Sequence, residues 1–194
     1  MKRSLKALLL GIFLLCVAGH ANAAITSVDN LFTNSEFRAV ASAYKGTLTG
    51  SYDLTYLGFE AGHTNILLQS SDNTVIFNNY DYNGKSSTSV GSTVDDVKID
   101  NLSFIDTNQN PSAPYNVYEW SNAVNIYLLS DILKVGSLTF YKGTYFIGFN
   151  DTVTAGNDFD NLVFAASPVP LPGAAVLLFS GLLGLVGLRR RELV

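Results

Sequence analysis

The residues best suited to chemistry in this sequence are the acidic and amide side chains of YFIGFNDTVTAGNDFDNLVF, residues 145–164. Hard cations such as calcium take about six to eight oxygen ligands from carboxylates, amides and backbone carbonyls. Two of these acids stand two residues apart, so they share one face of a predicted strand and repel each other unless a cation or solvent lies between them. The spacing is not that of an EF-hand. The alternative interpretation is an Asx-rich turn whose side chains cap their own backbone. The five residues concerned are Asp151, Asn157, Asp158, Asp160 and Asn161.

A second segment, YLGFEAGHTN at residues 56–65, resembles the first in its pattern. Both begin with an aromatic residue followed by x-Gly-Phe, and both then turn through glycine in an acidic or Asn-rich loop. We therefore expect two strand ends that converge in space. His63 is the only histidine after residue 23, and a lone histidine in a turn usually bonds locally or to water.

The sequence contains none of the catalytic motifs considered next. It holds no G-x-S-x-G elbow, no phosphate-binding loop, no dinucleotide-binding glycine pattern and no His/Cys zinc set. We expect no catalytic residues, although paired acids for polysaccharide hydrolysis stay an alternative, because their separation in space cannot be deduced from the sequence. Aromatic side chains either stack on sugar rings or fill a core. Those in question are Tyr44, Tyr52, Tyr56, Tyr80, Tyr82, Tyr115, Tyr118 and Trp120.

The elements that would position these residues are predicted to be strands. Alternation with period two, rich in Tyr, Phe, Val, Ile and Thr, is typical of strands. A tight hairpin is predicted at Lys142-Gly143, between residues 137–141 and 144–149. Eight or nine short strands favour an all-β fold, an antiparallel β-sandwich of jelly-roll-like type. The predicted strand segments are 51–59, 65–69, 74–80, 95–106, 116–120, 124–130, 137–149 and 158–166.

Three segments depart from this pattern. Residues 85–96, KSSTSVGSTVDD, lack a core pattern and are expected to form an exposed loop. Residues 108–114, NQNPSAP, form a second predicted loop, kept extended by its prolines. Residues 30–44 could hold a helical turn. Long loops on a β scaffold are where binding usually occurs.

The first 23 residues have the three parts of a secretory signal peptide. A basic start is followed by an apolar stretch and by the small-x-small cleavage pattern ending the segment, at Ala21 and Ala23. An N-terminal anchor is the alternative, but the apolar run is short for a span. We expect export through the Sec system, cleavage by signal peptidase after Ala23, and a domain over residues 24–166.

Charge and cysteine content restrict the partners of that domain. The only cysteine, Cys16, lies in the predicted signal peptide, so the mature chain forms no disulfide. Residues 24–166 carry fifteen acidic and six basic side chains, a net charge of −9. Such a domain repels nucleic acid, and we expect no nucleic-acid partner. Cations or neutral sugars are the plausible partners, unless the charge only keeps the protein soluble.

The last 28 residues, 167–194, have the pattern of a membrane anchor. Residues 169–188 carry no charge, and three arginines follow at once, Arg189, Arg190 and Arg191. About twenty helical residues span the hydrocarbon core, and a basic cluster marks its cytoplasmic side. We expect a transmembrane helix over about 171–188, with the domain facing outward.

This tail resembles a known sorting signal. VPLPGAAVLLFSGLLGLVGLRRR is similar to the VPLPA-CTERM form of the PEP-CTERM signal, with Gly173 where that form has alanine and without the usual tryptophan. The resemblance implies recognition by an exosortase, a membrane protease or transpeptidase, and cutting near the proline box. It implies a Gram-negative host, an inner-membrane intermediate and a final place at the cell surface or in an exopolysaccharide or biofilm matrix. The sorting residues would be Val169, Pro170, Leu171, Pro172 and Gly173, with Arg189, Arg190 and Arg191.

Two internal segments resemble patterns common in PEP-CTERM proteins. YLGFEAGHTN is similar to a YLGxEAGxxN segment, and GFNDTVTAGNDFDNLVF to a calcium-type GFNDxxxxDxDYNDLVF loop. The resemblance implies calcium ligands at Asp151, Asp158 and Asp160, with Glu60 a weaker candidate; Asn161 replaces a second acid. We expect a non-catalytic structural or interaction protein. The alternatives are a calcium-supported carbohydrate-binding module and a polysaccharide hydrolase.

Overall fold

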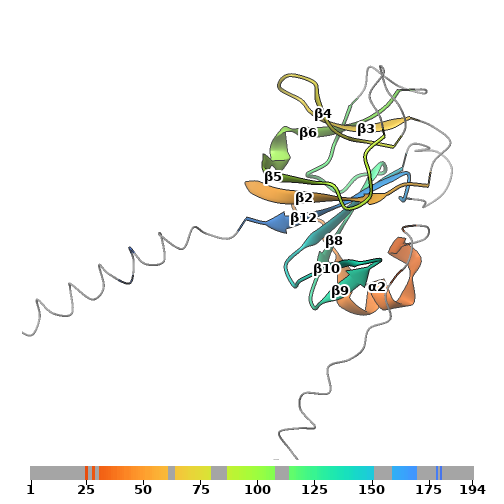
Figure 1. Cartoon of the computed structure of the whole chain (residues 1–194), viewed down its shortest axis with the longest axis vertical. Coiled ribbons are helices and arrows are strands. Elements are labelled where there is room, and N and C mark those ends of the chain that lie inside the picture. Colours follow the sequence, from red (N-terminus) through yellow and green to blue (C-terminus); the bar gives the residue numbers. More distant parts are fainter. Residues whose placement is uncertain are drawn as a thin grey trace, which may run out of the picture.

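The protein is built from antiparallel β-sheets, as Figure 1 shows. The structure, a computed structural model, describes Ile25, Val28, residues 31–60, 64–79, 87–107, 114–150 and 159–169, Leu178 and Ser180. A six-stranded sheet, here called the large sheet, has the order β1-β8-β11-β12-β2-β5. A four-stranded sheet, the small sheet, has the order β4-β3-β6-β7, and β9 and β10 form a separate pair. The strands are β1 Ala41–Ala43, β2 Ser51–Gly58, β3 Asn65–Gln69, β4 Thr74–Asn78, β5 Thr93–Lys98, β6 Leu102–Asp106, β7 Tyr115–Asn116, β8 Val124–Leu129, β9 Leu133–Val135, β10 Leu138–Phe140, β11 Tyr145–Phe149 and β12 Leu162–Pro168.

The centre of the large sheet is formed by strands that are apolar on both faces. In β12, Phe164 pairs with Ile147 on one side and with Tyr56 on the other. Alternate residues of a strand point to opposite faces. Phe164 therefore packs in the core between the two sheets, while its neighbours Val163 and Ala165 pack on the outer face. Strands of this kind need cover on both sides, and the fold supplies it.

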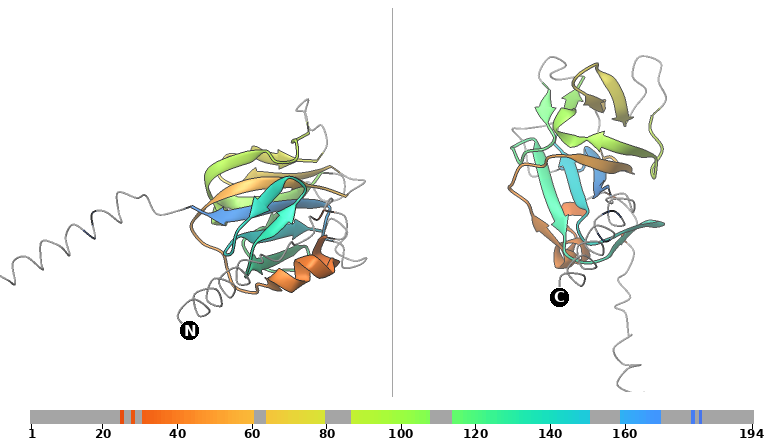
Figure 2. Two further views of the ribbon diagram at one scale, coloured as in Figure 1. Left: turned by 60° about the horizontal axis from the view of Figure 1, so that its bottom comes forward. Right: turned by 90° about the vertical axis from the view of Figure 1, so that its left-hand side faces the viewer.

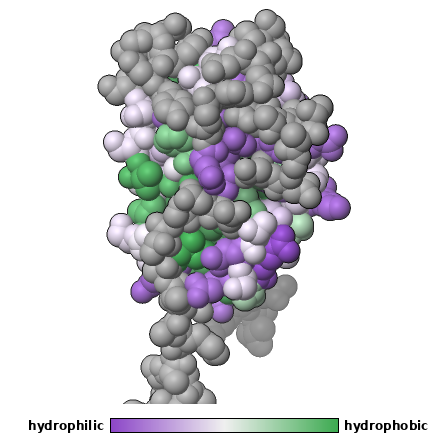
Figure 3. All heavy atoms as spheres, turned by 90° about the vertical axis from the view of Figure 1, so that its right-hand side faces the viewer, coloured by the Kyte–Doolittle hydropathy of each residue, from purple (hydrophilic) through white to green (hydrophobic). Residues whose placement is uncertain are grey.

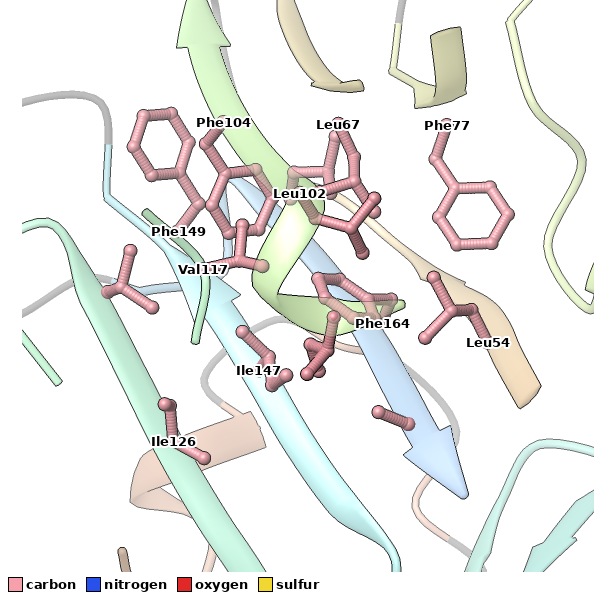
Figure 4. Close-up of a cluster of buried hydrophobic side chains, with 14 of the residues drawn as sticks. Leu54, Leu67, Phe77, Leu102, Phe104, Val117, Ile126, Ile147, Phe149 and Phe164 are labelled. Carbon is pink, nitrogen blue, oxygen red and sulfur yellow. The ribbon is translucent and has the colours of Figure 1, made fainter. Parts of the chain in front are cut away.

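The first layer of cover is the small sheet. Side chains from β2, β8, β11 and β12 meet those from β3, β4 and β6 in one buried cluster, shown in Figure 4. The rings of Phe104 and Phe149 stack across the two sheets with centroids 4.6 Å apart. This contact joins β6 to β11.

The second layer lies on the outer face of the large sheet. It consists of the 3-10 turn η1 Leu31–Thr33, helix α2 Ser35–Val40 and the β9–β10 pair. The helix begins at Asn34, whose side-chain oxygen accepts from the backbone N–H of Glu36 at 2.8 Å and of Phe37 at 3.3 Å. Phe37 is buried against Phe146 of β11, with ring centroids 5.4 Å apart. The helical turn predicted within residues 30–44 is confirmed.

The predicted hairpin at Lys142-Gly143 is wrong. A turn does form there, with Gly143 at φ 93°, but the two flanking strands do not pair with each other. Strand β10 pairs with β9, and β11 pairs with β8 and β12. The reason is burial on two faces: β11 needs cover on both sides, whereas β10 buries Phe140, and Leu138 in part, on one side only, against the outer face of the large sheet.

Residues 85–96 are not a loop throughout, because β5 begins at Thr93. This strand lies at the edge of the large sheet and exposes most of its side chains, so its sequence lacks a core pattern. Asp96 sits at a register shift with φ 53°, and its N–H donates to Asp53 Oδ1 at 3.0 Å. Charges and bulges are common protection for an edge strand.

Three further strand predictions need correction. The segment 95–106 is not one strand, because the 3-10 turn η2 Ile99–Asn101 carries the chain from the large sheet to the small one. In residues 116–120 only the start pairs, as β7. Twelve strands are present among the described residues rather than eight or nine, since the sequence pattern does not reveal short pairings such as β1 and β7.

The two ends of the paired sheets, both visible in Figure 2, differ in which strands begin and finish there. At one end β12 finishes at Pro168, which pairs with Tyr52; this is the tail end. At the other end β2 and β11 finish and β12 begins, with Gly58 opposite Val163 and Phe149 opposite Leu162; this is the loop end.

Candidate functional site

The loop end brings together the two segments that the sequence singles out. The backbone N–H of Glu60 donates to the Asp160 carbonyl at 2.7 Å. Gly58 of the first segment lies opposite Val163 of the second. The prediction that the two strand ends converge is confirmed.

Asn161 joins these segments to each other and to the small sheet. Its backbone N–H donates to the Phe149 carbonyl at 3.1 Å, and its side-chain Nδ2 donates to the Glu60 carbonyl at 3.1 Å. Its own carbonyl accepts from the side chains of Asn65 at 3.4 Å and Asn79 at 3.5 Å. One residue therefore fixes β2, β3, β11 and β12 relative to one another.

Asn65 and Asn79 form a second buried link. The backbone N–H of Asn65 donates to Asn79 Oδ1 at 2.7 Å, and the backbone N–H of Asn79 donates to the Asn65 carbonyl at 3.2 Å. Both residues are fully buried. Buried amides that satisfy backbone groups stabilise one arrangement of the strands, because a misplaced amide would lose those bonds.

Two carboxyl groups are buried at the same end. Asp160 is 2% exposed, and Asp106, which lies opposite Asn65 across the β3–β6 pairing, is 1% exposed. Glu60 is exposed. Within the part of the chain that the structure describes, the Oδ1 atom of Asn161 is buried and accepts no hydrogen bond. Figure 3 looks onto this end, where hydrophilic side chains lie next to hydrophobic ones. Carboxylate and amide oxygens are the donors that a hard cation takes.

The expected calcium ligands are placed only in part. Asp160 and Glu60 are neighbours, but the bond between them runs through their backbones. Asp160 also precedes β12, which begins at Leu162, so the predicted strand does not reach it. Asp151 and Asp158 lie outside the described residues, as does His63. Within the described ranges, no group of three or more His, Cys, Asp or Glu side chains is close enough to hold a metal ion.

Four further buried polar residues of this end, Asn65, Asn79, Asp106 and Asn150, are not among the site residues predicted from the sequence. A signal for them is present in the sequence, because each lies at an end of an apolar strand. Asn65 is the first residue of β3, Asp106 is the last residue of β6, and Asn79 and Asn150 directly follow β4 and β11. A polar residue at the end of an otherwise apolar strand marks a place where the core gives way to a polar network.

The aromatic side chains are mainly part of the packing. Tyr145 contacts Tyr44 and Tyr52 edge to face, with ring centroids 5.1 and 5.9 Å away, and burial raises the pKa of Tyr145 and of Tyr52. Trp120 packs on Tyr127 and lies 5.7 Å from Lys45 Nζ. Tyr141 is the single strongly exposed aromatic among the described residues. Tyr80 and Tyr82 are outside them.

The expected processing residues fall mostly outside the described part of the chain. Val169 directly follows β12 and is 37% exposed. Pro170, Leu171, Pro172 and Gly173 are not described, and neither are Arg189, Arg190, Arg191, Ala21 and Ala23. Leu178 and Ser180 are helical and exposed. Among the residues that the structure describes, no helix has the length and apolar character to cross a membrane.

Comparison of the chain with protein-family models, with curated proteins and with solved structures finds no match.

Proposed function

We propose that this chain is an exported, non-catalytic surface or matrix protein, sorted by an exosortase-type protease or transpeptidase. The observation that carries the proposal is the order of three sequence elements at the end of the chain: the VPLPG box at 169–173, an uncharged run, and three arginines. A signal-peptide pattern at the other end gives the same topology, with the domain outside and the C-terminus inside. Its role would be structural or adhesive, in contact with exopolysaccharide.

The positions of the two chain ends support this processing. Ile25, two residues after the expected cleavage at Ala23, is buried, and its N–H donates to the Lys134 carbonyl at 3.0 Å. At the other end the ordered pairing of β12 stops at Pro168, one residue before the proline box. A cut on either side would therefore leave every strand intact. The arrangement of two packed sheets supports classification as a β-sandwich, and its jelly-roll-like character stays a prediction.

The test is the intact mass and the C-terminal peptide of the protein isolated from its native host. We expect a chain that begins at Ala24 and ends between Pro170 and Gly173. A chain that runs to Val194 as the only form would show that the tail is a plain anchor and would overturn the sorting proposal.

A calcium-supported carbohydrate-binding module is the second candidate, and the buried polar network of the loop end favours it. The described residues fit a cation in part, since Asp160 supplies a buried carboxylate and Asn161 an amide oxygen beside it. Asp151 and Asp158 would have to complete the ligand set. If calcium binds the folded form alone, it raises the unfolding temperature. A thermal melt with calcium and with chelator tests the ion, and affinity gels cast with the host polysaccharide test the sugar.

A further inference from the structure

The tail end of the large sheet exposes an unusual set of apolar side chains. Tyr141 is 65% exposed, Ile132 45% and Val169 37%. Apart from Val90, which lies near Gly58 at the opposite half of the sheet, these are the strongly exposed large hydrophobic residues described within the domain.

Hydrogen bonds place the three side chains around the point where β12 ends. The turn that contains Tyr141 is fixed by Thr144, whose N–H donates to the Tyr141 carbonyl at 3.1 Å and whose Oγ1 lies 3.2 Å from Ser167 Oγ. The Thr144 carbonyl accepts from the N–H of Leu129, three residues before Ile132. Ser167 is two residues before Val169. Residues 129, 141–144 and 167 are thus linked by hydrogen bonds, and Ile132 and Val169 each follow a linked residue within three positions.

Charged side chains of both signs surround this set. Lys142 is exposed in the same turn, and Lys98 is exposed on β5, opposite Ser51 and next to the Tyr52–Pro168 pairing. Asp131 is exposed beside Ile132. Asp53 of β2 lies opposite Ser167, and its Oδ1 accepts from the N–H of the exposed Asp96 of β5. The rim of the large sheet therefore carries both lysines and acids.

The length of the connecting chain decides what this rim faces. The predicted span begins at about residue 171, three residues after Pro168. An extended residue covers at most about 3.3–3.6 Å, so Pro168 lies within roughly 10 Å of the hydrocarbon boundary. The headgroup layer itself is about 5–7 Å thick on each side. With so short a connection, the end of β12 and the segments beside it meet the headgroups.

We propose that the tail-end rim of the large sheet, formed by Ile132, Tyr141, Val169, Lys98 and Lys142, is a membrane-contact surface for phospholipid headgroups. This inference rests on the proposed function, because it requires the C-terminal span. Tyrosine is suited to the interface, since its ring is apolar and its hydroxyl is polar. Lysine extends its stem over apolar surface and places its charge among lipid phosphates. The acidic loop end then points away from the membrane.

The test uses the mature anchored chain, residues 24–194, reconstituted in vesicles of phosphatidylethanolamine with phosphatidylglycerol. This chain has no cysteine, so a single fluorescent label can be attached at Tyr141→Cys, and a matched label at the exposed Asn122→Cys of the loop end. A quencher is carried on the lipid headgroups. We expect strong quenching and a blue shift of the label at position 141, and neither effect at position 122.

Each other outcome contradicts a definite part of the argument. If the protein stays with the vesicles but the two labels are quenched equally, the proposal of a membrane-contact surface is wrong, while the predicted C-terminal span is supported. If the protein does not stay with the vesicles, the predicted C-terminal span is wrong, and the proposed contact surface, which depends on it, is wrong as well. The variant Lys98→Gln with Lys142→Gln tests the lysine contacts: the quenching at 141 should decrease while the protein stays with the vesicles. Unchanged quenching would remove the two lysines from the contact surface.

Discussion

Tyr56 is the largest of the fully buried side chains, and it brings a polar hydroxyl into the apolar core. It packs between the sheets, with its ring centroid 5.4 Å from that of Phe77. In the described part of the chain the hydroxyl has no hydrogen-bond partner, and burial raises the Tyr56 pKa above its ordinary value. A buried polar group without a partner opposes folding by roughly 1–3 kcal/mol.

The substitution Tyr56→Phe should therefore stabilise the domain. We expect the free energy of unfolding to rise by about 1 kcal/mol in urea denaturation at neutral pH. The control is Tyr141→Phe, whose exposed hydroxyl should contribute less than about 0.5 kcal/mol in either direction. A less stable Tyr56→Phe protein would mean that the hydroxyl has a partner.

Alkaline pH should enlarge that difference. The folded protein keeps the Tyr56 proton where the unfolded chain, with a tyrosine pKa near 10, loses it. The folded state then binds more protons, so the stability of the natural protein falls as pH rises above 10. The Tyr56→Phe protein lacks this loss, and the gap should widen by up to about 1.4 kcal/mol per pH unit. Unfolding midpoints at pH 8 to 11 measure it, and parallel curves would contradict it.

Asn161→Asp separates a cation site from a self-contained amide network. The change removes the donor to the Glu60 carbonyl and adds a carboxylate next to Asp160, so in chelator we expect a loss of about 2 kcal/mol or more. If calcium binds there, the added charge should make the calcium-induced rise in unfolding temperature larger than in the natural protein. The control is Asn125→Asp on β8, buried on a different strand, whose loss should be independent of calcium. Equal losses with and without calcium in Asn161→Asp would remove the ion from the site.

At the scale of elements, β11 shows how closely the layers approach the large sheet. It alternates side chains between the inner core, where Ile147 lies, and the outer cluster, where Phe146 lies. Gly148, two residues after Phe146, lies on the same outer face and leaves room there for Phe32 and for the backbone of Phe159. The φ of Gly148 is not in the left-handed region, so its backbone conformation does not require glycine. The requirement is the space that a Cβ would occupy.

The substitution Gly148→Ala should therefore strongly destabilise the domain. The new Cβ would overlap the Phe159 carbonyl oxygen and the Phe32 ring, and a backbone atom cannot move aside as a side chain can. We expect a loss of about 3 kcal/mol in chemical denaturation. Gly46→Ala is the matched control: there the Cβ meets only the Tyr44 side chain, so a loss below about 1 kcal/mol is expected. Similar losses at the two positions would contradict this account of β11.

At the scale of the whole molecule, β12 connects the folded body to the tail. It lies between β11 and β2 in the middle of the large sheet, and its last residues pair with Tyr145, Leu54 and Tyr52. A processing cut at the proline box removes none of these pairs. A cut a few residues earlier would remove the ladder that joins the two halves of the sheet.

Truncation tests this boundary. A chain of residues 24–169 should unfold cooperatively by circular dichroism, at the temperature found for the domain of the anchored protein. A chain of residues 24–164 loses Ala165, Ala166, Ser167 and Pro168 and should show no cooperative transition. A stable 24–164 chain would mean that the end of β12 is dispensable and that the folded body ends before the proline box.

Much of the element pattern followed from the sequence. The segment NILLQ is strand β3 at both ends, and β2 begins where the alternation of SYDLTYLG begins. Local alternation is enough because the period of two fixes which side chains share a face. The two acidic segments were also expected to meet, and they do, since each continues from a strand of the large sheet.

Pairing between strands was decided by the tertiary structure. The turn at Lys142-Gly143 predicts a hairpin, yet β11 pairs elsewhere because a strand apolar on both faces gains more from a central place in the sheet than from its nearest neighbour. Edge strand β5 could not be predicted, because an edge strand needs no core pattern. The network of Asn65, Asn79 and Asn161 joins residues 14, 82 and 96 positions apart, and no local pattern encodes such contacts.

The sequence by itself therefore determined the all-β class, the course of the longer strands and the expectation of a signal at each end, because each depends on composition or on a period within a few residues. The tertiary structure alone decided which strands are neighbours, which polar groups are buried together at the loop end, and which exposed side chains surround the exit of the tail. These depend on covering both faces of a central sheet, and that requirement acts between residues far apart in the chain.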